Sequence, residues 1–129
     1  MQLSEMHFSE EASRKLSQLK GRTGLTPNIL ARIGFCLSLE NPAPPDPSDY
    51  EGSGYINIKR HVLTGYYDPL FVALIKERCH QDYRPEEEWT VQFKAHMNLG
   101  VLLLHKRLKP LADLWSIPLL IDENRWDNG

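Results

Sequence analysis

Helix start signals between residues 8 and 47 constrain the fold of this chain more than any other stretch. Ser9 is a favourable N-cap, and two glutamates follow it in the first turn, where the helix dipole favours negative charge. Thr26 and Pro27 mark a second helix start, because proline is well tolerated at the first helical position. The sequence therefore predicts a helix hairpin, which the proline-rich stretch 41–54 follows as a surface loop.

Apolar residues recur at helical spacing in both helices. The second helix has a face broad enough to be covered on more than one side: Ile29, Leu30, Ile33, Cys36, Leu37 and Leu39. We expect Gly21 to end the first helix, because a left-handed residue after a helix is usually glycine. Gly34 lies inside the second helix at a cost of about 1 kcal/mol relative to alanine. Its presence predicts that another backbone packs closely there.

The rest of the chain predicts a mainly α, compact single domain. The expected elements are a short strand or extended arm at 2–8, a strand at 55–63, a helix at 68–80, the main core helix from Pro85 to about Lys109, and a short helix at 111–115. The domain is expected to span 1–115, with 116–129 as a C-terminal tail. An arm followed by two helices is also the order of ribbon-helix-helix DNA-binding proteins.

Composition limits the classes of function. The formal net charge is −2, so binding to nucleic acid would need a local patch of cations. The chain has neither a long apolar run nor a signal peptide, and we expect a soluble cytoplasmic protein. Cys36 and Cys79 form no CxxC pair, and two packed, free thiols are the expected state.

Residues for catalysis are hard to assemble from this sequence. The five histidines form neither an HExxH motif nor a cluster with cysteine, and the sequence contains no phosphate-binding glycine loop. The three glutamates at 86–88 are explained by the charge preference of a helix start, so they do not indicate a Mg²⁺ site. We therefore expect no catalytic residue, metal or cofactor.

Basic residues offer a better indication of function. Cations cluster on or beside the helix hairpin and in the centre of the strand at 55–63: Arg14, Lys15, Lys20, Arg22, Arg32, Lys59 and Arg60. They indicate either contacts to DNA phosphates or an ordinary solvated helix face. Assembly would favour the first interpretation, because symmetry multiplies each patch, and the broad apolar face of the second helix makes assembly plausible.

Three segments resemble the DndE family of DNA sulfur modification proteins. The first comprises Leu-Lys-Gly-Arg-Thr-Gly at 19–24 and the stretch from Leu-Ala-Arg-Ile-Gly to Asn-Pro-Ala-Pro-Pro at 30–45. The others are Leu-Ile-Lys-Glu-Arg-Cys-His-Gln-Asp at 74–82 and Phe-Lys-Ala-His-Met-Asn-Leu-Gly at 93–100. Together they cover most of residues 5–105 in the family's order.

The resemblance implies a role in bacterial DNA phosphorothioation, in which sulfur replaces a non-bridging oxygen of the DNA backbone. It implies a small helical protein that assembles as a homotetramer and binds duplex DNA, preferably nicked. The chemistry would belong to partners: a cysteine desulfurase, an iron–sulfur sulfurtransferase and an ATPase. Gly21 and Gly24 match the family's glycine pair associated with assembly, and Lys15, Lys20 and Arg22 would contact phosphates.

Three alternatives remain open from the sequence. A ribbon-helix-helix regulator would be a dimer that reads bases through residues 2–8. A scaffold would bind acidic partner surfaces and no DNA. An enzyme or sulfur carrier would use Cys36 or Cys79, although a thiol on an apolar stripe is expected to be inert.

Overall fold

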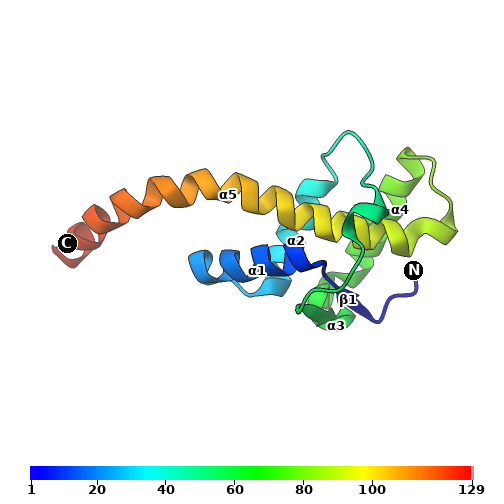
Figure 1. The fold of residues 1–129 in the computed structure, drawn as a ribbon, viewed down its shortest axis with the longest axis horizontal. Helices are drawn as coiled ribbons and strands as arrows, with labels where there is room; N and C mark the ends of the chain where they lie inside the picture. The colour runs from blue at the N-terminus through cyan, green and yellow to red at the C-terminus, as the bar shows by residue number, and fades with distance from the viewer. Residues whose placement is uncertain (129) are drawn as a thin grey trace.

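The computed structural model describes the backbone of residues 1–128 and the side chains of residues 1–108. It is mainly helical, as predicted, and is organised around the long helix α5, Trp89–Asn128. Figure 1 shows α1 (Glu10–Thr23) running beside α5, with α4 (Asp68–Gln81) at the other end of the molecule. The helix α2 (Pro27–Ser38) crosses α5 and packs against it more extensively than any other element does.

Helix α1 begins where the sequence predicts and ends later. The Ser9 hydroxyl accepts a hydrogen bond from the Ala12 N–H at 3.1 Å, which is the expected N-cap. The predicted end at Gly21 is wrong, because the helix continues to Thr23. Gly24 takes the left-handed position with φ 76°, and its N–H donates to the Lys20 carbonyl at 2.9 Å. Gly24 therefore provides the helix end predicted at Gly21.

Helix α2 begins at Pro27 after the N-cap Thr26, as predicted. Its buried residues are Leu30, Ala31, Gly34, Phe35 and Ser38. The apolar face is covered on one side only in the protomer, and Ile33 keeps 42% of its surface exposed. The expectation of a packed Cys36 is therefore wrong, since this thiol lies on the open side, whereas Cys79 is buried as expected. The close backbone approach predicted at Gly34 is confirmed, with Gly100 of α5 as the neighbour.

A two-stranded antiparallel sheet joins the N-terminal arm to the middle of the chain. Strand β1 (Glu5–His7) pairs with β2 (Asn57–Lys59), with Met6 opposite Ile58. The arm is thus a strand, as predicted. Because β1 pairs within its own chain, the pairing does not require the second protomer that a dimeric DNA-reading β-ribbon needs.

The strand predicted at 55–63 is shorter than expected. It ends at Lys59, and Arg60–Leu63 forms the one-turn helix α3. The Arg60 N–H donates to the Ser4 carbonyl at 2.9 Å, and the Thr64 hydroxyl donates to the Arg60 carbonyl at 3.0 Å. The first bond still belongs to the pairing with the N-terminal arm, whereas the Arg60 carbonyl also accepts the Thr64 N–H at 3.0 Å and begins α3. Side-chain alternation therefore overestimated the length of the strand.

Short 3₁₀ turns connect the remaining elements: η1 (Pro47–Tyr50) in the proline-rich loop, η2 (Gly65–Tyr67) before α4, and η3 (Glu86–Glu88) before α5. The break predicted after residue 109 is absent, because α5 continues to Asn128. A proline can be accommodated inside a helix by local bending, and Figure 1 shows α5 as a bowed helix. The predicted docking of side chains at 111–115 lies outside the described side chains, and no helix in the described part could span a membrane.

The core lies where α1, α2, α4 and α5 meet. Phe35 is at its centre, with ring centroids 5.4 Å from Phe71 and 5.2 Å from Phe93. On the predicted main core helix, the apolar residues at helical spacing from Phe93 onward are buried: Phe93, Met97, Val101 and Leu104. The core helix prediction is therefore confirmed, and the packed core fixes the position of the cations on the surrounding surface.

Candidate nucleic-acid interface

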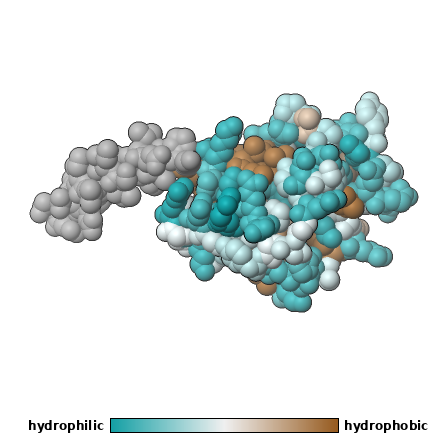
Figure 2. Space-filling view, in the orientation of Figure 1, coloured by the Kyte–Doolittle hydropathy of each residue, from teal (hydrophilic) through white to brown (hydrophobic). Residues whose placement is uncertain are grey.

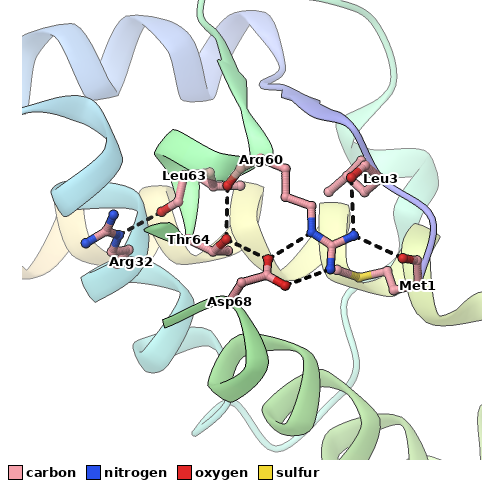
Figure 3. Close-up of polar contacts among 7 residues, drawn as sticks. All are labelled: Met1, Leu3, Arg32, Arg60, Leu63, Thr64 and Asp68. Carbon is pink, nitrogen blue, oxygen red and sulfur yellow. Dashed lines mark hydrogen bonds and ion pairs between the residues drawn. The ribbon is translucent and has the colours of Figure 1, made fainter. Parts of the chain in front are cut away.

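The cation with the most partners is Arg60. Its guanidinium donates to both carboxylate oxygens of Asp68 at 2.8 and 2.9 Å, and to the carbonyls of Met1 and Leu3 at 3.0 and 3.3 Å (Figure 3). The hydrogen bond from Arg60 lowers the pKa of Asp68, and one from the Thr64 hydroxyl contributes to the shift. Arg60 thus holds the N-terminal arm against the start of α4. This internal role differs from the phosphate contact predicted for it.

Arg32 also binds within the protomer. Its Nε donates to the Leu63 carbonyl at 2.7 Å, and a terminal nitrogen donates to the Val62 carbonyl at 3.1 Å. Figure 3 shows the guanidinium reaching from α2 to the end of α3. Carbonyls at a helix end lack intrahelical partners, and a cation is favoured there. Arg32 therefore connects α2 to α3 and has few donors left for a ligand.

Two predicted cations form exposed ion pairs. Lys15 lies 2.9 Å from Glu11 one turn earlier, and Lys59 lies 2.9 Å from Glu5 on the neighbouring strand. Such pairs contribute little stability because water screens them. A strong anion could therefore displace either carboxylate, but each carboxylate reduces the local positive potential.

The remaining predicted cations, Arg14, Lys20 and Arg22, are exposed on α1. Within the described side chains, none of the three has a hydrogen-bond or ion-pair partner. Lys20 and Arg22 flank Gly21 in the last turns of the helix, where basic residues oppose the negative end of its dipole. Figure 2 shows a hydrophilic surface over α1. We call these three residues the α1 cations.

The predicted assembly glycines lie beside the α1 cations. A Cβ atom added at Gly21 or Gly24 would meet nothing within 4 Å in the protomer. Both positions are exposed, so the intramolecular packing does not require glycine at position 21. At Gly24 the left-handed backbone gives glycine a local role as well. The open surface at this end of α1 is available for a neighbouring molecule.

Two further exposed cations, near the predicted end of the core helix, are not among the predicted DNA-contact residues. Lys106 and Arg107 lie within the longer α5, directly after His105. The His105 ring nitrogen is 2.8 Å from the Gln18 amide oxygen of α1, so these cations follow a contact between α1 and α5. They share a groove with Glu40, which lies in the turn after α2. Only tertiary packing brings these residues together, and no local sequence signal indicates it.

The described residues contain no cluster of three metal-ligating side chains. Burial raises the pKa of the Cys79 thiol to about 11, and burial also raises the pKa of Cys36. Both thiols are therefore mainly protonated near neutral pH, whereas a nucleophile or sulfur carrier acts as the thiolate.

Comparison with known proteins identifies relatives of this chain. The family model described as DNA sulphur modification protein DndE matches residues 5–110. A crystal structure of DndE from Escherichia coli B7A, involved in DNA phosphorothioation modification, aligns with a TM-score of 0.63 and 25% identity, covering 78% of this chain and 97% of that one. The structure of a DndE G21/24K mutant shares the fold, with a TM-score of 0.63 and 24% identity, covering 81% and 99%. Comparison with curated proteins gives no significant match.

Proposed function

Because the chain belongs to the DndE family, whose members take part in DNA phosphorothioation, we propose that it is the non-catalytic DNA-binding subunit of this machinery. In this proposal it acts in the cytoplasm and binds duplex DNA, with a preference for a nick. Its partners are the sulfurtransferase and ATPase subunits, which perform the chemistry and supply the energy. The protein contributes a surface that holds the DNA backbone.

The observation that carries the proposal is the contrast among the cations. Arg32 and Arg60 bind protein carbonyls and carboxylate. The α1 cations remain exposed and without partners in the described part of the protein. Cations that serve no internal purpose are the groups that can neutralise phosphates and release counterions. Duplex binding through these residues would be independent of sequence and sensitive to salt.

Assembly would convert a small patch into an effective site. Three cations on one protomer give weak binding, whereas a homotetramer presents four copies at fixed spacing. The open surface at Gly21 and Gly24 supports a protomer contact at this end of α1. A nick would favour binding if the four patches require the DNA to bend, because a nicked duplex bends at lower cost than an intact one.

The decisive experiment measures the affinity of the purified protein for nicked, intact and single-stranded DNA at several salt concentrations. We expect Lys20→Glu combined with Arg22→Glu to lower duplex affinity at least tenfold and to reduce the salt dependence. A matched control reverses two other exposed lysines, Lys76→Glu with Lys94→Glu. It makes the same change in net charge on elements away from the end of α1.

Equal loss of affinity in both double variants would show that only net charge matters and would contradict a site on α1. Unchanged DNA affinity in the Lys20 and Arg22 variant would exclude these two α1 cations as the DNA-binding site. A wild-type protein that binds no DNA at low salt but binds the sulfurtransferase or ATPase would instead support the scaffold role. Circular dichroism of each variant checks that the fold is retained.

A further inference from the structure

Helices α2 and α5 diverge from their contact at Gly34 and Gly100, and an open groove of about 380 Å³ lies between them. Leu37 of α2 and Leu103 of α5 contribute apolar side chains to its lining, together with Pro42. No described side chain fills this groove. Its lining suits an apolar segment that a partner would insert.

The outer face of α2 extends the apolar lining of the groove. Ile33 is 42% exposed and lies one helical turn before Leu37 on the same face, with the exposed Cys36 beside them. The only charged residue of α2 is Arg32, and its guanidinium is bound to the end of α3. Helix α2 therefore supplies no free charged side chain beside the strip formed by Ile33, Cys36 and Leu37. Such a strip on a surface helix indicates a protein contact.

Opposite charges line the two sides of the groove. Glu40 lies on the α2 side, and Lys106 and Arg107 lie on the α5 side. A duplex would be repelled by Glu40 and would leave the apolar lining without a partner, while an acidic peptide would also meet Glu40. A second copy of this chain carries both charges on the same groove, so a two-fold contact would allow Glu40 of each copy to pair with Lys106 and Arg107 of the other. A two-fold contact requires self-complementarity of this kind.

We propose that the α2–α5 groove and the strip Ile33, Cys36 and Leu37 form a two-fold contact between protomers. This inference rests on the proposed function insofar as that function includes assembly. It adds a contact on a surface separate from Gly21 and Gly24, and a tetramer would then use both surfaces. The apolar strips pack across the axis, and the paired charges at the groove fix the orientation.

The first test is cross-linking through Cys36 with a short bismaleimide. Cys36 is exposed and Cys79 is 1% exposed, so only one of the two thiols is accessible to the reagent, which is used at a mildly alkaline pH to increase the thiolate fraction. Because the strip lies on the proposed axis, we expect a covalent dimer in high yield at concentrations where the protein assembles. The Cys36→Ser variant is the control and should give none. A wild-type oligomer that gives no covalent dimer would overturn the proposed contact.

The second test measures mass by multi-angle light scattering, with DNA affinity measured in parallel. We expect Ile33→Asp to remove the tetramer. Glu40→Lys should weaken assembly, and adding Lys106→Glu with Arg107→Glu should restore it. The triple variant distinguishes a charge pair between protomers from simple loss of the fold. A tetramer that survives both Ile33→Asp and Glu40→Lys would overturn the inference.

The two proposals can fail separately. An assembled wild-type protein that binds DNA, but whose mass is unaffected by changes at Ile33 and Glu40, disproves this contact and leaves the proposed function intact. Conversely, a wild-type protein that cross-links through Cys36 and binds no DNA supports the contact and contradicts the DNA-binding role. A monomeric wild type would contradict the contact and the assembly part of the proposed function.

Discussion

The backbones of Gly34 in α2 and Gly100 in α5 are in direct contact where the two helices cross. A Cβ atom on Gly34 would lie 2.6 Å from the Gly100 carbonyl carbon and 2.7 Å from its oxygen. Real side chains do not approach a backbone this closely, so neither position accepts alanine without moving a helix. The contact sets the spacing between α2 and α5 and therefore the position of the hairpin and its cations. It also sets the point from which the α2–α5 groove opens.

Alanine at position 100 is therefore expected to destabilise the protein. Gly100→Ala should cost about 1–3 kcal/mol of unfolding free energy, as overpacking typically does, despite the better helix propensity of alanine. Urea unfolding followed by circular dichroism measures this effect. Gly21→Ala is the matched control at protein concentrations where the chain is monomeric, since Gly21 is also helical and has open space around it within the protomer. It should be neutral or stabilising by up to about 1 kcal/mol; equal destabilisation of both variants would contradict the close contact.

The sequence allowed one half of this contact to be predicted. A glycine inside a helix has an entropic cost, so Gly34 indicated a close neighbour before the neighbour was known. Gly100 could be placed on the buried stripe of the core helix from its spacing. Pairing the two requires the crossing geometry of α2 and α5, which local periodicity does not contain. Helix starts and apolar stripes, in contrast, were predicted well because they depend on residues that are close together in the sequence.

The carboxylate of Asp68 is expected to make stability depend on acid pH. Its pKa is held below the usual value of 3.8, mainly by the hydrogen bonds from Arg60. A carboxylate with a lowered native pKa stabilises the fold above its unfolded pKa, and this stability is lost as pH falls through the native value. Asp68→Asn should therefore destabilise the protein near neutral pH by about 1–3 kcal/mol, the range for hydrogen bonds to charged groups.

Below about pH 4 the difference between wild type and Asp68→Asn should shrink, because the wild-type carboxyl becomes protonated. Unfolding free energies from urea titrations between pH 3 and 7 measure this convergence. Asp46→Asn is a comparison, since hydrogen bonds from the neutral Ser48 also lower the pKa of Asp46 but lie in an exposed loop, so its effect on stability should be smaller. A constant difference across the pH range for Asp68→Asn would contradict the assigned ion pair.

His96 should produce a separate pH dependence at higher pH. The side chain is fully buried, and its Nδ1 lies 2.9 Å from the Ser38 hydroxyl. Burial lowers the pKa of His96 from 6.5 to about 4, and the nearby Arg78 charge adds to the shift. The unfolded chain therefore binds a proton between pH 6.5 and 4 that the native state excludes. Stability should fall with decreasing pH in this window by up to about 1.4 kcal/mol per unit.

The His96→Asn variant tests this assignment. The shorter amide can reach the position of Nδ1 near Ser38 and cannot titrate, so the slope of stability against pH between 6.5 and 4 should become shallower. The loss of packing lowers stability at every pH and does not affect the comparison of slopes. His80→Asn is the control, because it makes the same substitution at an exposed histidine outside the core. Parallel curves for wild type and His96→Asn would exclude His96 as the titrating group.

The roles of the cations were less predictable than the helices. Arg60 was predicted in the centre of a strand, but α3 begins there and the side chain turns to Asp68. Asp68 was correctly placed at the start of a helix, yet no periodic pattern links it to Arg60. The use of Arg32 at the end of α3 is likewise a tertiary contact. The positions of basic residues in the sequence therefore show where cations lie along the chain. Only the folded structure shows which of them remain available to a ligand.

Tyr83, in the turn after α4, is expected to lower stability through its backbone. It has φ 57°, which costs a non-glycine residue roughly 1 kcal/mol, and its side chain is 95% exposed. Tyr83→Gly should therefore raise the unfolding free energy by about 0.5–1 kcal/mol, after allowing for the greater entropy of glycine in the unfolded chain. Tyr66→Gly is the matched control, since Tyr66 is 94% exposed and lies in η2 without a positive φ. Tyr66→Gly should destabilise the protein. If thermal unfolding showed a change in stability of the same sign for both variants, it would contradict backbone strain at Tyr83.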